Sequence, residues 1–286
     1  MKKKFASFVE AILIGVAVYT VGWGCSGNKE LTSSNGEYVT IRKNIQDISS
    51  VVTSSSIDIV FYQRSGTPSV KIHAPEEVAK HVVVDDSNGR LNVHFEKSFR
   101  QTFSGDVIVT VYAPSLVSAY TLSSGDIRIP KGIYTEGRLE METRASGDIK
   151  CGDVQCYELV CSTLGSGDLE IDKASCQSAT LDIKASGDCD IEQLDCAGKL
   201  TASVKASGDL SVSGKAVSAF YRVAGSGDLE ASELKADSVE ATNAASGDLY
   251  CYASKSLVAV SRGSGTLYYS GNPQQFKPNG RRIEKR

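Results

Sequence analysis

The chain has 286 residues, with 31 Lys and Arg against 34 Asp and Glu and a formal net charge of −3. This length suits one large domain or two small ones, and the apolar content of 41% is enough to build a core. The charges are mixed and no basic block lies in the body of the chain, so nucleic acid is excluded as an expected partner.

Residues 1–24 predict a lipoprotein signal peptide. Three Lys precede an apolar run that is too short for a comfortable membrane span. The run ends in Gly24-Cys25-Ser26, and a small residue directly before a Cys resembles a bacterial lipoprotein signal, although Gly22 stands where Leu or Val is usual. Cleavage would leave a lipidated Cys25 as the membrane anchor. Ordinary secretion and an uncleaved anchor are the alternatives.

Residues 25–36 are rich in Ser, Gly, Asn and Lys and predict a flexible tether between lipid and domain. Residues 37–114 then form a predicted N-terminal β-strand region. Its strand signals are short alternating or β-branched runs, separated by turn clusters, at 38–41, 57–61, 69–72, 81–84, 90–95 and 107–112. Residues 75–80 alone predict a helical turn, and the Ser-Gly-Asp at 104–106 matches the later repeat in part.

From residue 115 the tripeptide Ser-Gly-Asp recurs about every 20 residues. Its Asp residues are Asp126, Asp148, Asp168, Asp188, Asp209, Asp228 and Asp248. A degenerate last copy is Ser264-Gly265-Thr266. A near-fixed period of this size is typical of a solenoid, in which each repeat buries its apolar face only against its neighbours.

Each repeat has the pattern of two short strands. The residues one and three after the Asp are apolar and the one between is mostly polar, as in Leu169-Glu170-Ile171. Apolar residues also lie nine and seven positions before each Asp, so every rung presents one face inward. We predict an all-β, parallel β-helix-like solenoid with ~20-residue rungs over residues 115–272, continuous with the preceding strand block. Residues 273–286 form a basic C-terminal tail or cap that blunts the last edge.

The Ser-Gly-Asp corner has a structural explanation. Gly is expected to supply the positive φ of a tight bend, and the Ser and Asp side chains are expected to bond the backbone of their own turn. The residue three before each Asp is always small, which a crowded bend requires. The motif therefore predicts a bend before it predicts chemistry.

The cysteines follow the same repeat. None of the seven after Cys25 forms a Cys-x-x-Cys pair and the chain has only three His, which argues against zinc. We predict buried free thiols that fill inward slots; disulfides between rungs, and redox or metal chemistry, are the alternatives. The seven are Cys151, Cys156, Cys161, Cys176, Cys189, Cys196 and Cys251. Three of them lie eight residues after their Asp, and Tyr134, Val217 and Ala236 are expected to fill the same slot in other repeats.

Together these features resemble a known family. The lipoprotein signal, the strand block over 57–95, the segment 107–114 and the Ser-Gly-Asp corners ending in Gly271-Asn272-Pro273 look like the auto-transporter adhesin, head GIN domain family. The resemblance covers roughly residues 38–275. It implies a right-handed β-helix-like fold in an envelope protein of Bacteroidetes-like bacteria, and it brings no catalytic residues.

Two sets of side chains are candidate sites. The row of seven Asp places like charges on neighbouring rungs, which invites Ca²⁺; the alternative is a row of turn caps that needs no cofactor. Tyr250 and Tyr268, with Tyr252 close by, are expected to face outward and to offer an aromatic contact surface for a protein or a glycan. Simple stacking between rungs is the alternative.

We therefore expect a non-catalytic cell-envelope lipoprotein, held on the outer membrane through Cys25, that serves in surface adhesion or recognition. A periplasmic structural scaffold is the alternative, and the two differ in which membrane face carries the protein. A polysaccharide-active β-helix enzyme is disfavoured, because the acidic residues are spread one per rung and the His residues lie far from them.

Overall fold

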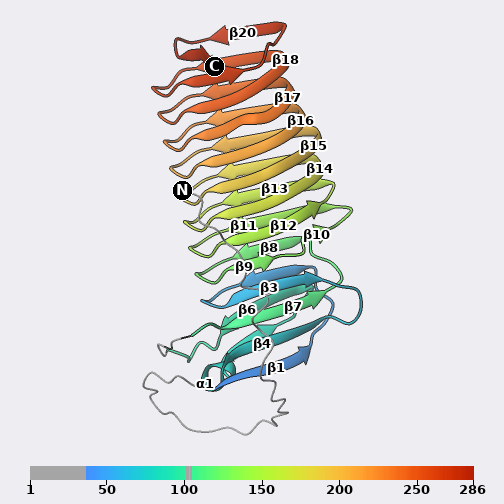
Figure 1. The fold of residues 1–286 in the computed structure, drawn as a ribbon. Coiled ribbons are helices and arrows are strands. Elements are labelled where there is room, and N and C mark those ends of the chain that lie inside the picture. Colours follow the sequence, from blue (N-terminus) through green and yellow to red (C-terminus); the bar gives the residue numbers. More distant parts are fainter. Residues whose placement is uncertain (1–36, 101–102, 104) are drawn as a thin grey trace.

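The computed structural model describes residues 37–100, 103 and 105–286, which form an all-β rod (Figure 1). The predicted signal peptide, the tether and Cys25 lie outside these residues. The rod is a β-solenoid of about 8 turns with ~20-residue rungs, which confirms the predicted fold class. Within the described ranges, no helix is long and apolar enough to cross a membrane.

The N-terminal region supplies seven strands and one helical turn. They are β1 (Tyr38–Asn44), β2 (Ser50–Thr53), β3 (Asp58–Gln63), β4 (Ser69–Pro75), α1 (Glu76–Ala79), β5 (Val82–Asp85), β6 (Arg90–Phe95) and β7 (Ile108–Ala113). The helical turn predicted over 75–80 is confirmed as α1. Strand β2 escaped prediction, because four residues are too few to show a period.

The rungs of this region are not stacked in chain order. Strand β2 lies in parallel register between β6 and a later strand, β8 (Ser118–Thr121). Strand β3 likewise pairs in parallel with β7 and with β9 (Ile127–Ile129). The rung built from β2 and β3 is therefore sandwiched between two rungs that follow it in the sequence.

Antiparallel strands close this end of the rod. Strand β4 pairs antiparallel with β7 and carries β1 on its other side, while β5 pairs antiparallel with β6. Figure 1 shows β1, β4 and α1 at the end opposite to the C-terminus. Such a cap is what a solenoid needs where its stack of identical rungs stops.

The repeats form the rest of the rod. The strands that follow β9 are β10 (Ile133–Tyr134), β11 (Arg138–Thr143), β12 (Ile149–Gln155), β13 (Glu158–Thr163), β14 (Leu169–Ile183), β15 (Cys189–Val204), β16 (Leu210–Val223), β17 (Leu229–Asn243), β18 (Leu249–Ser261), β19 (Leu267–Ser270), β20 (Gln275–Asn279) and β21 (Ile283–Lys285). Residues 273–286, predicted as a tail or cap, form strands that pair in parallel with β18 and β19.

The register agrees with the alignment on the Asp residues. Leu169 pairs with Cys189, which pairs with Leu210, so equivalent apolar residues stack on one another along the rod. These inward ladders of Leu, Ile, Val, Ala and Cys form one continuous buried core from the N-terminal cap to β19. Each repeat has a second corner about eight residues after its Asp, and this corner aligns less well. Tyr134 and Val217 are each 53% exposed at positions where inward residues were expected. Ala216 pairs with Cys196 and fills the slot in place of Val217, whereas Ile133 pairs with Val154 and fills a different inward position.

The expected role of glycine at the Ser-Gly-Asp corner is wrong. None of the seven glycines in these repeats is among the residues with positive φ. A Cβ on Gly187 would instead lie less than 3.0 Å from the carbonyl oxygen of Gly167 on the rung before, and the other corners are equally tight. Glycine is needed because successive backbones approach too closely for a side chain.

Gly105 and Asp106, from the partial copy of the motif, do not belong to the stack of corners. Asp58 pairs in register with Ile108, so Asp106 lies two residues away from the position of the other Asp residues. Gly105 has a φ of 111°, unlike the glycines of the repeats, and the Asp106 N–H donates to the Tyr38 hydroxyl at 3.1 Å. The 20-residue spacing is coincidental there, because rung order and chain order differ in this region.

Candidate functional site

The Asp residues of the corners are joined by hydrogen bonds from rung to rung. The backbone N–H of Asp188 donates to Oδ1 of Asp168 at 2.9 Å, and the N–H of Asp209 donates to Oδ1 of Asp188 at 2.8 Å. The same bond recurs at every corner from residue 126 to Thr266, with distances of 2.7 to 3.1 Å. The carboxylates therefore bind the next rung and not, as expected, their own turn.

The row begins one rung earlier than the motif. Asp58 in β3 accepts the N–H of Asp126 at 3.1 Å, although Ile57 replaces the glycine before it. We call the row the aspartate ladder, and its members are Asp58, Asp126, Asp148, Asp168, Asp188, Asp209, Asp228 and Asp248. Arg128 bridges its first two members, at 2.9 Å to Oδ2 of Asp58 and 2.8 Å to Oδ2 of Asp126. The Ser-Ser-Ile-Asp sequence was the available signal for Asp58.

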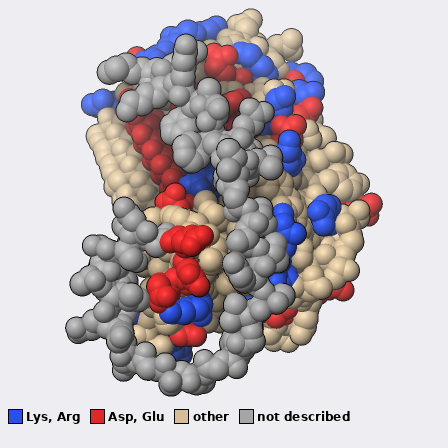
Figure 2. All heavy atoms as spheres, turned by 60° about the horizontal axis from the view of Figure 1, so that its bottom comes forward, with Lys and Arg blue, Asp and Glu red and all other residues tan. Residues whose placement is uncertain are grey.

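The ladder forms a negative strip, and acidic side chains gather in a column along the rod in Figure 2. Burial, reinforced by the neighbouring carboxylates of Asp126 and Asp168, raises the pKa of Asp148. One oxygen of each carboxylate is used by the backbone bond. No group of three or more His, Cys, Asp or Glu in the described ranges is arranged to hold a metal. Binding of Ca²⁺ between the remaining oxygens stays a prediction, which a calorimetric titration tests.

The predicted tyrosines meet at the C-terminal end of the rod. Tyr250 and Tyr268 pair in register between β18 and β19, and their rings stack with centroids 4.9 Å apart and an interplanar angle of 12°. The guanidinium of Arg286 lies 3.9 Å from the Tyr268 centroid and 4.9 Å from that of Tyr250. Tyr252 is not part of this stack, and its ring carries the Lys235 ammonium at 4.1 Å.

These side chains line a hollow with a volume of about 370 Å³, which we call the tip hollow. Tyrosine rings contribute to its lining, and Glu230, Glu233, Lys235 and Arg286 supply charges of both signs. Sequence reasoning missed Arg286, because only the fold shows that the end of the chain returns to β19 through β21. The arrangement offers flat apolar rings beside hydrogen-bonding charges, as contact surfaces do.

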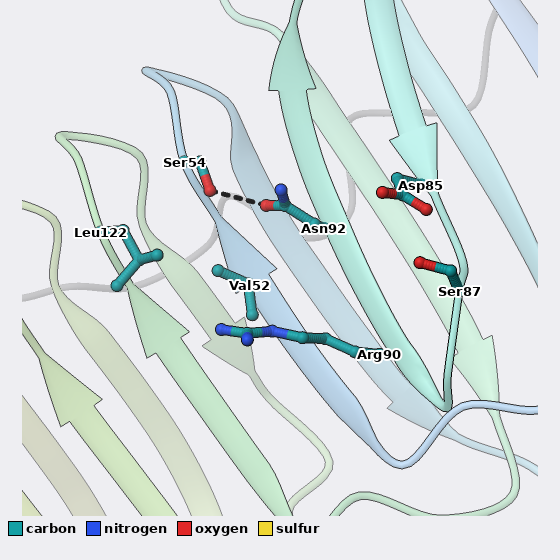
Figure 3. Close-up of a pocket in the computed structure, with 7 residues that line it drawn as sticks. All are labelled: Val52, Ser54, Asp85, Ser87, Arg90, Asn92 and Leu122. Carbon is teal, nitrogen blue, oxygen red and sulfur yellow. Dashed lines mark hydrogen bonds between the residues drawn. The ribbon is translucent and has the colours of Figure 1, made fainter.

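A second hollow lies near the other end of the rod. Its volume is about 290 Å³, and we call it the lateral hollow (Figure 3). It lies among β2, β5, β6 and β8, and its lining residues are Val52, Ser54, Asp85, Ser87, Arg90, Asn92 and Leu122. Sequence reasoning gave no signal for it, because these residues come from segments whose neighbourhood depends on the altered rung order.

All seven cysteines of the described chain are buried free thiols, as predicted. Burial raises the pKa of Cys151, Cys189 and Cys251 to about 12, so these thiols are protonated and unreactive at neutral pH. Cys176 and Cys196 pair in register on neighbouring rungs, and a hydrogen bond between their side chains lowers the pKa of Cys196. All seven cysteines are part of the buried core.

The fold defines a class of protein, the capped β-solenoid. Solved structures with the same fold include a putative lipid binding protein from Parabacteroides distasonis, with a TM-score of 0.63 and 24% identity over 89% of this chain and 99% of that one. Putative adhesins from Bacteroides fragilis (TM-score 0.56, 20% identity, 89% and 99% covered) and Parabacteroides merdae (0.64, 17%, 89% and 98%) are also similar. No curated protein matches the chain.

The sequence itself matches the family described as "Putative auto-transporter adhesin, head GIN domain" over residues 47–212 and 165–273. The chain belongs to this family, as its corners and its Gly-Asn-Pro ending predicted. The family is described as an adhesin and not as an enzyme, which indicates a protein of the cell envelope or surface.

Proposed function

We propose that the protein is a non-catalytic lipoprotein on the bacterial outer membrane, where it serves in surface adhesion or recognition. The observation that carries this proposal is the position of the tip hollow. Its stacked Tyr250 and Tyr268 lie at the end of the rod opposite to β1, where the described chain begins.

A lipid on Cys25 would place the tip hollow at the far end from the membrane. Eleven residues lie between Cys25 and Glu37, and a tether of this length spans at most about 40 Å. The rod then acts as a spacer, and its rung-to-rung hydrogen bonds keep it straight enough to present the tip. Tyr and Arg dominate the energetic centres of many protein interfaces, and both line this hollow.

The proposal is tested with cells that carry the Tyr250→Ser/Tyr268→Ser double variant. We expect these cells to lose most of their adherence to surfaces coated with extracellular-matrix proteins, at an unchanged amount of surface protein. Tyr157→Ser is the matched control, because Tyr157 is 63% exposed at a distant corner. Equal adherence of the wild type, the double variant and the control would refute the role of the tip hollow.

Lipid attachment has its own test. Cys25→Ala should abolish incorporation of labelled palmitate and move the protein from the membrane fraction to the soluble fraction. Unchanged labelling would exclude Cys25 as the anchor. The control is Cys156→Ala, which removes a buried thiol and leaves the signal sequence intact.

The alternative is a periplasmic scaffold, which protease treatment of intact cells separates from a surface protein. Digestion of the rod supports the surface location, and protection until the outer membrane is broken supports the scaffold. A polysaccharide-active enzyme is disfavoured further, because one oxygen of each ladder carboxylate accepts a backbone N–H instead of facing a second catalytic group.

A further inference from the structure

The lateral hollow gathers side chains from three separate parts of the chain. Strand β5 lies antiparallel to β6, which places Asp85 opposite Asn92. Strand β2 lies parallel to β6 on its other side and places Val52 beside Asn92, and β8 places Tyr120 beside Val52. Figure 3 shows the Ser54 and Asn92 side chains pointing toward one another and the Arg90 guanidinium extending toward Val52 and Leu122.

The hydrogen-bonding groups of this hollow are complementary and partly unused. The Ser54 hydroxyl donates to Oδ1 of Asn92 at 2.6 Å, and the Asn92 amide also carries an NH₂ group that can donate. The Arg90 guanidinium lies 5.7 Å from the Tyr120 ring centroid. Within the part of the chain that the structure describes, neither Arg90 nor Asp85 forms an ion pair.

Asp85 can only accept hydrogen bonds, the Arg90 guanidinium can only donate them, and the Ser87 hydroxyl can do both. A ligand that spans this set must itself both donate and accept hydrogen bonds. The several hydroxyl groups of a sugar do so. Val52 and Leu122 add an apolar floor against which C–H groups can pack.

We propose that the lateral hollow binds a neutral sugar. Its volume of about 290 Å³ lies at the lower end of ligand pockets, which span about 300–1,000 Å³, so it suits one or two sugar rings and not an acyl chain. A phosphate or carboxylate group fits less well, because the Asp85 carboxylate would repel it while Arg90 attracts it. This site rests on the proposed recognition function and gives it a ligand class, but it does not involve the tyrosines of the tip.

The affinity expected for one sugar ring is modest. A ligand of about a dozen heavy atoms at an ordinary efficiency reaches a Kd of about 1 mM. Methyl-detected NMR of the purified protein suits this range, because Val52 and Leu122 carry reporter methyl groups inside the hollow. The probes are the methyl glycosides of glucose, galactose, mannose and N-acetylglucosamine, with glycerol and sodium phosphate for comparison.

We expect at least one glycoside to give saturable shifts at Val52 and Leu122, and Arg90→Ala and Asp85→Asn each to weaken binding about tenfold or more. Unchanged methyl signals in the distant core of each variant show that it is folded. The proposal is overturned if no glycoside shifts these methyls, if both variants bind as the wild type does, or if only phosphate binds.

The Tyr250→Ser/Tyr268→Ser variant separates this inference from the proposed function. It should bind the glycoside with unchanged affinity, since the tip hollow lies at the other end of the rod. Loss of adherence with sugar binding retained supports two separate sites. Retained adherence in that variant would contradict the tip hollow alone, whereas absent glycoside shifts would contradict the lateral hollow alone.

Discussion

The most informative single perturbation is replacement of Asp188 in the aspartate ladder. Its Oδ1 accepts the N–H of Asp209 at 2.8 Å, and its own N–H donates to Asp168 at 2.9 Å. Asp188→Ala removes the acceptor and the charge, whereas Asp188→Asn removes the charge and keeps an oxygen in the same place. The difference between the two variants isolates the hydrogen bond.

The magnitudes follow from the rung spacing. Two carboxylates about 4.8 Å apart repel by about 0.9 kcal/mol in water, and physiological salt reduces this roughly by half. Two neighbours therefore cost Asp188 about 1 kcal/mol. A hydrogen bond to a charged acceptor contributes about 1.5–3 kcal/mol and one to a neutral acceptor about 0.5–1.5 kcal/mol. We expect Asp188→Ala to lower the free energy of unfolding by about 1–2 kcal/mol and Asp188→Asn to change it by less than about 0.5 kcal/mol.

Urea unfolding followed by circular dichroism measures both variants. The control is Glu192→Gln on the same rung, which removes one exposed charge that makes no ion pair or side-chain hydrogen bond in the described structure. In about 1 M salt only about a fifth of the unscreened repulsion remains, so the wild type should gain about 0.5 kcal/mol relative to Asp188→Asn. Equal stability of the Ala and Asn variants would refute the structural role of the ladder.

Four further outcomes follow from the structure. Gly187→Ala should destabilise the rod by about 1–3 kcal/mol or more in urea unfolding, because its Cβ would meet the preceding rung, whereas Gly137→Ala has nothing within 4 Å and should change little. Tyr221→Phe should raise the melting temperature, because the buried Tyr221 hydroxyl has no hydrogen-bond partner in the described structure and its removal is worth about 1 kcal/mol; a lower temperature would contradict this. Cys151 should resist iodoacetamide at pH 8 in the folded protein and react once it is unfolded, as mass spectrometry will show. Because the pKa of Asp148 is raised in the folded state, its contribution to stability falls as pH rises above about 4, and Asp148→Asn should remove that part of the pH dependence.

The repeating part of the fold could be predicted because its rungs all meet the same requirement. Residues such as Leu169 and Ile171 must point inward on every rung, so the alternation repeats with the period of the solenoid. The corner was predicted in position but not in mechanism. At Gly187 the glycine is needed because the backbone of the preceding rung lies too close for a side chain. The sequence of one repeat does not show whether a glycine is needed for a positive φ or for such a close approach.

The candidate sites were predictable only where neighbours in space follow the repeat. Tyr250 and Tyr268 are one rung apart in the sequence and stack as that spacing implies. Tyr252 departs from this pattern, because the register between β17 and β18 shifts near the second corner and pairs Tyr252 with Lys235. The second corner differs in length from repeat to repeat, so residues there do not recur at a fixed spacing. Tyr134 and Val217 are exposed at such corners.

The altered rung order explains why the lateral hollow lies where it does. The rung of β2 and β3 lies between two rungs that come later in the sequence. The strands on its two sides therefore come from segments that are far apart in the chain. This brings Ser54 of one rung against Asn92 of another, 38 residues away, where a regular repeat would place residues about 20 apart. Regular rungs generate rows of equivalent side chains, whereas the irregular end brings unlike groups from distant segments together, such as Ser54, Asn92 and Leu122. Selective binding of a small ligand requires unlike groups that converge, so we expect small-ligand selectivity to reside at the irregular end, while the repeats set the reach of the rod and carry the tip hollow.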